Sequence, residues 1–472
     1  MTLDLSRLDR AFNPRCVAVV GDSRRNDFRW LKADSQFKGK LYSVQINPET
    51  VAEINAMGIP NYPSLLDIPD EVDLAIVAVP REAVLRVVDD CIRKGVTAVH
   101  IFAAGFAETG TPEGLKLDRQ LVEKANKANL YLIGPNCLGI FNPGLGIRQG
   151  EEQYTGTSGP VGFIAQSGNL TSSFSLEAHL QGVDINKSVS LGNGMVLDST
   201  DFLEYFGQDP GIKVIGMYLE GVKDGRRFLK VLKQVATRKP VLVWKGGRTE
   251  AGQRAIGSHT GSLAIPRVVW ETAVRQCGAL TIAGMEEMID TMKALLYLPP
   301  VTGDRVGAAG GSGGWSVTVA DLFSEAGLKV PMLTRKSYDE LATFFVLIGG
   351  GCGNPMDTGG NVNGREMSRI MQILARDDNV DNLVLFVATR PGRHFNEQQI
   401  KDDLAILSDI KKMTSKPLLT LVHCSTPEAE VESRHVILQF QGAGIPAFPS
   451  VSRGAKALRN ALEYYRVNDE IV

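Results

Sequence analysis

The sequence predicts an α/β protein built from consecutive doubly wound domains, each with a parallel sheet between layers of helices. Short apolar runs rich in β-branched residues recur along its 472 residues. They alternate with segments in which apolar residues return every three or four positions. Such runs are typical of strands buried on both faces, and an apolar residue at every third or fourth position is typical of amphipathic helices. Their alternation implies parallel strands joined by right-handed crossovers.

The first domain is expected over residues 1–145. Helical patterns such as REAVLRVVDDCIRKG separate its apolar runs. After Asn142 the sequence becomes rich in proline and glycine, which marks the end of the domain. Five strands are predicted: Cys16–Val20, Leu41–Ile46, Leu74–Val79, Ala98–Phe102 and Leu130–Ile133.

Two further domains are expected over residues 155–300 and 304–472, because the same alternation starts again after each break. The sequence LPPVTGDR separates them and has the paired prolines and glycine of a linker. In the second domain the predicted strands are Val161–Ala165, Ser188–Leu191, Val214–Leu219, Val241–Trp244 and Leu280–Ala283. In the third they include Val306–Ala309, Leu383–Ala388, Leu418–Val422 and Pro446–Pro449.

Composition and charge exclude several classes of protein. A formal net charge of -2 provides no basic field for nucleic acid or an anionic membrane. No apolar run is long enough to span a bilayer, and the start MTLDLSRLDR lacks the apolar segment of a secretory signal. The six cysteines lie far apart without a C-x-x-C pair, as expected for reduced thiols. We therefore expect a cytoplasmic protein that binds neither nucleic acid nor membrane.

A glycine turn directly follows the first predicted strand, in the sequence VVGDSRR. Gly21 allows a tight turn after which backbone amides can face a phosphate, and Ser23, Arg24 and Arg25 follow it. The segment is compatible with a dinucleotide site, a coenzyme A site or a plain turn. The dinucleotide fingerprint G-x-G-x-x-G is absent, whereas guanidinium groups suit phosphates.

A second special loop, IGPNCLG, follows the fifth predicted strand. Pro135 and Gly139 impose an unusual backbone path, and Asn136 can bond to its neighbours or to a ligand. Ligands of doubly wound sheets bind at the carboxyl ends of the strands, where this loop falls. Cys137 is either part of that site or a simple buried thiol.

The sequence FIAQSGNLTSSF predicts a strand, a turn and a helix. Ser167 and Gly168 would begin the helix, where unpaired amides and the helix dipole favour an anion. An ordinary helix cap formed by Ser167 is the alternative, and the two roles are compatible. A nucleophile elbow is disfavoured, because Ala165 stands where that motif has glycine.

One of the six histidines stands apart from the others. His259 lies in Lys245–Ile265, which is rich in glycine, serine and threonine and is expected to form a long loop. Small neighbours leave room for a bulky group, and an imidazole held by a carboxylate can act as a nucleophile. Glu220, at the end of another predicted strand, would lie at the same sheet edge. A surface histidine or a general base are the alternatives. No second histidine or cysteine nearby has the spacing of a zinc site, so no metal site is expected.

Six motifs along the chain together carry a family resemblance. In order they are VVGDS, IGPNCLG, AQSGNL, SLGN, YLEG and GSHTGSLA. The chain resembles the NDP-forming acyl-CoA synthetases, a superfamily that includes succinyl-CoA synthetase and ADP-forming acetate–CoA ligase. SGGWSVTVADLFSEAGLKVP and GNPMD also look like this family's third domain, so the resemblance covers almost the whole chain.

The resemblance implies a CoA-binding Rossmann-like domain followed by two flavodoxin-like, succinyl-CoA synthetase-like domains. It implies that His259 is phosphorylated and that Glu220 stabilises the phosphohistidine. It further implies a phosphate site and a CoA site, with acyl phosphate as the intermediate between acyl-CoA and phosphohistidine. The residues implied for phosphate are Ser167, Gly168 and Asn193, and those for CoA are Gly21, Ser23, Arg24, Pro135, Asn136 and Cys137.

The resemblance also implies a second subunit. All three predicted domains are already assigned, which leaves no room for an ATP-grasp domain. ATP or ADP and Mg²⁺ would therefore bind a beta-type ATP-grasp partner in a hetero-oligomer, with carboxylic acid and acyl-CoA as substrates. Two segments depart from the family pattern, RRNDFRWLKADSQFKGK after the first turn and GMVLD after SLGN. A regulatory acyl-CoA-binding protein is the runner-up, and an NAD-dependent oxidoreductase is disfavoured.

Overall fold

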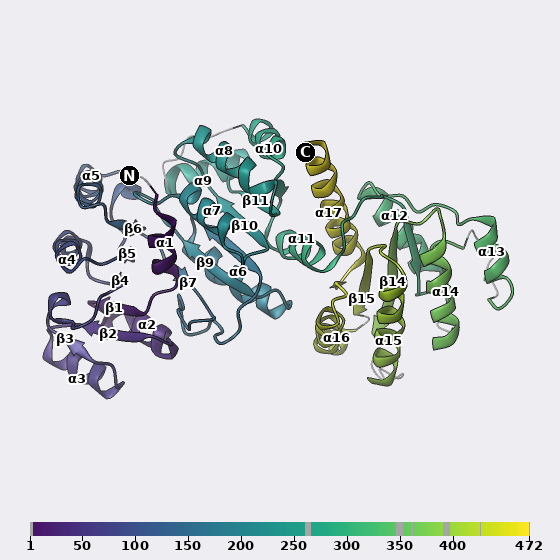
Figure 1. Cartoon of the computed structure of the whole chain (residues 1–472), viewed down its shortest axis with the longest axis horizontal. Coiled ribbons are helices and arrows are strands. Elements are labelled where there is room, and N and C mark those ends of the chain that lie inside the picture. The colour runs from purple at the N-terminus through teal and green to yellow at the C-terminus, as the bar shows by residue number, and fades with distance from the viewer. Residues whose placement is uncertain are drawn as a thin grey trace. The chain divides into compact units, whose positions relative to one another are not determined.

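The fold consists of two compact α/β units, residues 1–283 and 284–472 (Figure 1). The computed structural model describes residues 3–259, 266–345, 353–359, 362–389, 397–424 and 426–471. The first unit contains two six-stranded sheets, and the second contains a four-stranded sheet. Helices separate parallel strands in every sheet, so the predicted fold class is confirmed.

The first sheet is entirely parallel, with the strand order β3-β2-β1-β4-β5-β6. Its strands are β1 (Cys16–Val20), β2 (Lys40–Val44), β3 (Asn61–Tyr62), β4 (Leu74–Val77), β5 (Ala98–Ile101) and β6 (Tyr131–Ile133). The α-helices are α1 (Leu5–Phe12), α2 (Arg29–Ala33), α3 (Pro48–Ala56), α4 (Arg81–Lys94) and α5 (Pro112–Lys127). Single 3₁₀ turns are η1 (Arg24–Asn26), η2 (Asp34–Gln36), η3 (Leu65–Asp67) and η4 (Ala107–Thr109).

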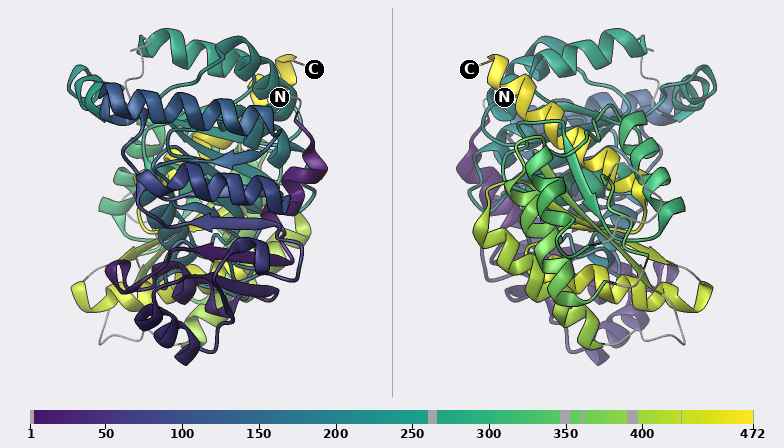
Figure 2. Two further views of the ribbon diagram at one scale, coloured as in Figure 1. Left: turned by 90° about the vertical axis from the view of Figure 1, so that its left-hand side faces the viewer. Right: turned by 90° about the vertical axis from the view of Figure 1, so that its right-hand side faces the viewer.

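Both faces of the first sheet are buried, as its continuous apolar strands require. Val17 and Val19 of β1 belong to the apolar cluster that includes α1 and α2. Ala18 and Val20, on the opposite face, belong to the cluster that includes α4 and α5. Figure 2 shows α4 and α5 side by side over one face of this sheet.

The second sheet has the order β12-β11-β10-β8-β9-β7, and β7 runs antiparallel to β9. Its strands are β7 (Gly139–Phe141), β8 (Val161–Ala165), β9 (Ile185–Ser190), β10 (Val214–Leu219), β11 (Val241–Lys245) and β12 (Leu280–Ile282). Its helices are α6 (Gly168–Leu180), α7 (Ser199–Gln208), α8 (Gly225–Ala236), α9 (Glu250–His259) and α10 (Arg267–Gln276).

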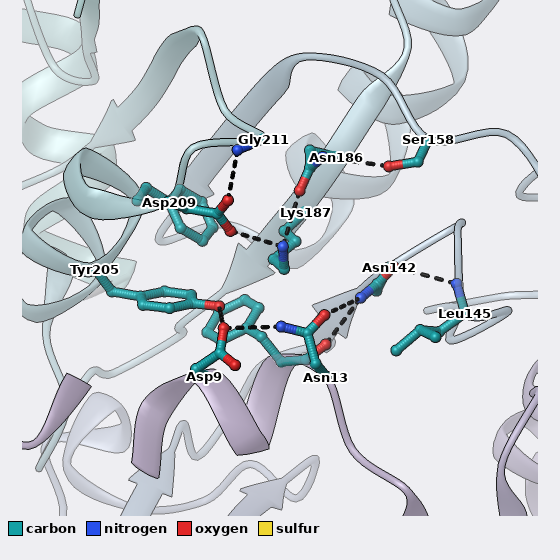
Figure 3. A network of polar contacts seen from close by, with 12 residues as sticks. Asp9, Asn13, Asn142, Leu145, Ser158, Asn186, Lys187, Tyr205, Asp209 and Gly211 are labelled. Atoms are coloured by element: carbon teal, nitrogen blue, oxygen red, sulfur yellow. Dashed lines mark hydrogen bonds and ion pairs between the residues drawn. The ribbon is translucent and has the colours of Figure 1, made fainter. Parts of the chain in front are cut away.

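The two sheets of the first unit are joined by helix α1, which packs on α7. The ring of Phe12 lies 5.4 Å from that of Phe206. Polar contacts surround this apolar centre (Figure 3). The Tyr205 hydroxyl donates to the Asp9 carboxylate at 2.8 Å, and Lys187 pairs with Asp209 at 2.7 Å. Apolar packing and the bond from Tyr205 to Asp9 thus join helix α1 to the layer of the second sheet.

The second unit is a parallel sheet in the order β13-β14-β15-β16. Its strands are β13 (Val306–Ala309), β14 (Asn382–Thr389), β15 (Leu418–Cys424) and β16 (Ala447–Phe448). Its helices are α11 (Met285–Tyr297), α12 (Gly313–Glu325), α13 (Arg335–Leu341), α14 (Gly364–Arg376), α15 (Glu397–Met413), α16 (Glu430–Gly442) and α17 (Val451–Ile471), with the turn η6 (Pro427–Ala429). Helices α11 and α17 are tied by the Arg453–Asp290 ion pair at 2.6 Å.

The expected long loop at Lys245–Ile265 is wrong over residues 250–259, which form helix α9. The Thr249 hydroxyl accepts the amide of Gly252 at 3.1 Å and starts the helix. Good helix formers between the glycines then outweigh the cost of the glycines, about 1 kcal/mol each. Across the described residues, no helix combines the length and the apolarity needed to cross a membrane.

Candidate functional site

The carboxyl edge of the second sheet gathers most of the residues predicted for phosphate chemistry. Strands β9, β8, β10 and β11 are neighbours and run parallel, so the turns that follow them share one edge. Asn193 follows β9, Ser167 and Gly168 follow β8, and Glu220 follows β10. The fold therefore places these four residues at the edge where ligands of α/β sheets bind.

The turn after β8 leads directly into helix α6. Ser167 is the N-cap, and its hydroxyl accepts the amide of Leu170 at a long 3.4 Å. The amide of Thr171 bonds to the Ser167 carbonyl. Within the described part of the chain, the amides of Gly168 and Asn169 have no acceptor, as is usual in a first helical turn. These open donors and the positive end of the helix dipole favour a bound anion.

The side chain of Gln166 connects the turn after β8 to the turn after β10. Its carbonyl oxygen accepts the amides of Glu220 and, at 3.0 Å, Gly221. The carboxylate of Glu220 is buried and accepts a bond from the Tyr218 hydroxyl at 3.3 Å. Burial and the neighbouring Glu220 charge raise the pKa of Tyr218 to about 12, so the phenol stays protonated and can donate. Glu220 is thus held at both its main chain and its carboxylate.

Four residues separate the end of β11 from the start of helix α9, which ends at His259. Gly247 has a φ of 67°, which favours glycine, and a Cβ atom there would lie 2.5 Å from Ile256 Cδ1, so the helix packs closely on this turn. The side chain of His259 and residues 260–265 lie outside the described residues. The described part establishes that the chain segment carrying His259 leaves the sheet at the same edge as Glu220.

The predicted CoA loop of the first sheet packs against the turn after β9. The amide of Asn193 donates to the Pro135 carbonyl at 3.1 Å. A Cβ atom on Gly192 would lie 2.3 Å from the carbonyl oxygens of Pro135 and Asn136, so the two loops meet backbone to backbone. Asn136 itself adopts a φ of 57°, a conformation that asparagine tolerates better than most residues. The structure therefore brings the Pro135 loop to the predicted phosphate residues.

Cys137 is directed into the protein core. Its side chain is buried, and its thiol lies 3.6 Å from the Ile101 carbonyl. Burial raises the pKa of the thiol to about 12, which keeps it protonated and unreactive at neutral pH. The carbonyl of Cys137 pairs with the buried ring of His100 at 3.1 Å. Burial lowers the pKa of His100 to about 4, so the neutral ring donates this bond.

Glu108 is a site residue that the sequence reasoning missed. One carboxylate oxygen accepts the amides of Gly105 at 2.6 Å and Phe106 at 3.2 Å, and the other accepts the side-chain amide of Asn193 at 2.6 Å. It therefore links the turn after β5 to the loop after β9. Glu108 follows a predicted strand and a glycine, and this position in the sequence could have indicated a site residue.

The Gly21 turn lies at the carboxyl edge of the first sheet, and β4 and β5 separate its strand from β6. A Cβ atom on Gly21 would lie 2.3 Å from Val79 Cγ1, which explains the glycine. Ser23 caps η1 in a capping box with Asn26, and the exposed Arg24 pairs with Glu53. Among the described residues, no hydrogen bond or ion pair joins this turn to the Pro135 loop.

No described group of three or more histidine, cysteine, aspartate or glutamate side chains is arranged to hold a metal ion. The charged groups at the second-sheet edge include Glu220, Lys245 at the end of β11 and Lys223 beyond Glu220. Such an edge can bind an anionic group through its amides and ammonium groups.

Comparison with known families and structures assigns two of the domains. The model of a CoA binding domain matches residues 15–143, and that of a succinyl-CoA ligase like flavodoxin domain matches residues 158–295. Fold and matches together define a CoA-binding protein of the ligase type.

Relatives that match most of this chain define the family more closely. The chain is 35% identical over 425 residues to the acetate–CoA ligase [ADP-forming] II subunit alpha of Pyrococcus furiosus, covering 88% of this chain and 89% of the relative. It is 38% identical over 385 residues to acetate–CoA ligase [ADP-forming] I of Archaeoglobus fulgidus. That match covers 81% of this chain, which spans only 55% of the longer relative. The chain belongs to the NDP-forming acyl-CoA synthetases, as an alpha-type chain.

A solved structure agrees with this assignment. The dinucleotide forming acetyl-coenzyme A synthetase 1 of Ca. Korarchaeum cryptofilum, in complex with phosphate and ADP, superposes with a TM-score of 0.84 at 30% identity. The match covers 98% of both chains.

Proposed function

We propose that the chain is the CoA-binding, phosphohistidine-carrying subunit of an ADP-forming acyl-CoA synthetase. The complete enzyme would interconvert a carboxylic acid, CoA and ATP with acyl-CoA, ADP and phosphate. The observation that carries the proposal is the second-sheet edge, where the open amides of α6 adjoin Glu220 and the segment ending at His259. An anion-binding helix end beside a carboxylate-supported histidine is suited to phosphoryl transfer.

The proposed reaction proceeds in three balanced steps. Phosphate attacks the thioester carbonyl, and the CoA thiolate leaves and takes up a proton. An imidazole nitrogen of His259 then attacks phosphorus, the P–O bond to the acyl group breaks, and the carboxylate leaves with the electron pair. ADP finally accepts the phosphoryl group and regenerates the free imidazole. Glu220 would orient the imidazole and balance its positive charge.

The binding residues follow the same proposal. Phosphate would bind the amides at Ser167 and Gly168 and the side chain of Asn193, which would exchange its bond to Glu108 for one to the ligand. CoA would contact the Gly21–Arg24 turn and the Pro135–Cys137 loop. Because the Cys137 thiol is buried, the main chain of that residue would make its contact.

We also propose the division into three domains at 1–145, 155–300 and 304–472, and a beta-type ATP-grasp partner that binds ATP or ADP and Mg²⁺. The P. furiosus relative is named as a subunit alpha, which supports a partner chain. Phosphohistidine would carry the phosphoryl group between the sites of the two subunits in a cytoplasmic hetero-oligomer.

Phosphate labelling tests the proposed function. The chain is purified with its co-purifying partner, incubated with radioactive ATP and Mg²⁺, and the label is tested for acid lability. We expect an acid-labile, alkali-stable label on this chain that disappears in His259→Ala. Glu220→Gln should slow labelling without unfolding the chain.

His435, on the exposed surface of α16, provides a matched control for the histidine substitution. His435→Ala should be labelled like the wild type. Acid-stable label, or label that survives His259→Ala, contradicts the phosphohistidine role. CoA binding without any labelling would instead favour a regulatory acyl-CoA-binding protein.

A further inference from the structure

Two half-buried lysines stand at opposite ends of strand β11, and each binds two main-chain carbonyls. At the carboxyl end, Lys245 Nζ donates to Glu220 O at 2.8 Å and Gly246 O at 2.6 Å. At the amino end, Lys239 Nζ donates to Phe206 O at 3.1 Å and also to a second carbonyl, that of Asp209. The two ammonium groups thus have similar surroundings, but only Lys245 lies at the candidate site.

The two bonds of Lys245 join the two segments that the proposed chemistry requires. One accepting carbonyl belongs to Glu220, whose carboxylate would support the imidazole. The other belongs to Gly246, the first residue of the segment that continues through α9 to His259. Loss of the ammonium would leave both carbonyls without this donor and would weaken the link between the two segments, which the Gly246 amide also joins through its 2.9 Å bond to the Leu219 carbonyl.

The charge of Lys245 is partly desolvated. Burial lowers the pKa of its ammonium, and the neighbouring Glu220 opposes this effect. From β10, Glu220 and the Tyr218 phenol are the titratable groups at this turn. From α10, Trp270 contributes its ring, whose centre lies 5.7 Å from Nζ. A partly desolvated cation acts more strongly on a nearby anion than a solvated one.

We infer that Lys245 is a positioning residue of the phosphoryl-transfer site, where its ammonium holds the turn of Glu220 and the segment leading to His259 together. The same positive charge favours the accumulation of phosphate at this edge of the sheet. This inference rests on the proposed function, because it assigns Lys245 a part in the formation of phosphohistidine.

The test is the rate of labelling from radioactive ATP and Mg²⁺, measured by rapid quench on the complex with the partner chain. Lys245→Met keeps most of the length of the side chain and removes its donors and charge. We expect labelling to slow on the order of 100-fold, with the KM for ATP unchanged. Lys245→Arg restores a cation and should recover most of the rate. Lys239→Met is the control, and it should lower the stability of the fold without slowing labelling.

A pH profile separates positioning by charge from simple structural support. Because burial lowers the pKa of Lys245, wild-type labelling should decline at a pH below that of an ordinary lysine, and Lys245→Arg should extend labelling to higher pH. Labelling of Lys245→Met at the wild-type rate overturns this inference and leaves the proposed function intact. Equal slowing in Lys239→Met also overturns it. Absence of label from the wild-type chain overturns both proposals.

Discussion

The turns after β1 and β8, the first parallel strands of the two sheets of the first unit, differ in how their backbone amides are satisfied. After β1, the buried carboxylate of Asp22 accepts the amides of Ser23 at 3.2 Å and of Trp30 and Leu31 at 2.9 Å. After β8, a neutral amide, Gln166, binds the neighbouring turn, and the first amides of α6 stay open.

The two turns therefore have different capacities for an anion. At the first turn, the protein supplies its own negative charge, and a phosphate would rely on outward-facing side chains such as Arg24. At the second turn, the helix amides themselves can bind it. Two similar patterns of strand, turn and helix thus differ because one has a buried aspartate where the other has a glutamine.

The largest expected effect on stability comes from the titration of Asp34, a buried carboxyl whose pKa is raised in part by Asp22 of the first turn. Asp34 lies at the end of α2, and the first amides of this helix donate to Asp22. Burial raises the pKa of Asp34 to about 7, Arg148 opposes the rise, and the charge of Asp22 adds to it. The folded chain therefore holds a proton that the unfolded chain releases near pH 4. The free energy of unfolding should fall as the pH rises from about 4 to about 7, by up to about 4 kcal/mol. Urea unfolding across this range measures the fall, and a flat profile would contradict it.

Asp34→Asn is the companion variant for this titration. It keeps the shape of the side chain and removes the titrating group, so the slope between pH 4 and 7 should become shallower. A slope equal to that of the wild type would assign the pH dependence to other groups.

Asp22→Ala removes the carboxylate that accepts the backbone amides of the turn after β1. Two buried amides and one half-buried amide would lose a charged acceptor, and the free energy of unfolding should fall by about 3 kcal/mol. Asp27→Asn, which removes an exposed charge paired with Lys32 and tolerates the left-handed backbone there (φ 55°), should change it by less than about 1 kcal/mol. Similar losses in the two variants, measured by urea unfolding at pH 8, would remove the basis of the comparison.

Gly168→Ala tests how closely the turn after β8 is packed. A Cβ atom there would lie 2.9 Å from Leu138 Cγ, so we expect a loss of about 1–3 kcal/mol in unfolding free energy and weaker phosphate binding. Gly225 is the matched control, because it also begins a helix but a Cβ atom on it would meet no described atom within 4 Å. Gly225→Ala should be neutral or slightly stabilising, and an equal loss in both would point to backbone effects alone.

Ser167→Ala should have the smallest effect on stability. The cap bond to Leu170 is long at 3.4 Å, so its loss should lower the free energy of unfolding by less than about 1 kcal/mol. Thr111→Ala, which removes a 3.1 Å cap bond on α5, should cost at least as much. The KM for phosphate should rise only in Ser167→Ala, and a rise in neither variant would count against an anion site at α6.

Local patterns in the sequence predicted much of this architecture. Val161–Ala165, Val214–Leu219 and Val306–Ala309 form strands with the predicted bounds, because continuous apolar runs mark strands buried on both faces. The two-residue strand β3 and the three-residue strand β7 were missed, since Asn61–Tyr62 contains no apolar run and Gly139–Phe141 starts inside the segment that was interpreted as a loop.

The candidate site was less accessible from the sequence. The turns carrying Ser167, Asn193 and Glu220 could be placed at one edge because they follow predicted parallel strands. The contacts of Glu108 with Asn193 and of Lys245 with Glu220 join residues far apart in the chain. Only the folded arrangement reveals them.

Strand β7 has a consequence for any attempt to divide the first unit. It precedes the boundary predicted at residue 145 but pairs with β9 as the last strand of the second sheet. A fragment beginning at residue 155 would expose the backbone of β9 as a free edge, which invites aggregation. Gene fusions and domain exchanges within this family should therefore keep residues 139–141 with the sheet they complete.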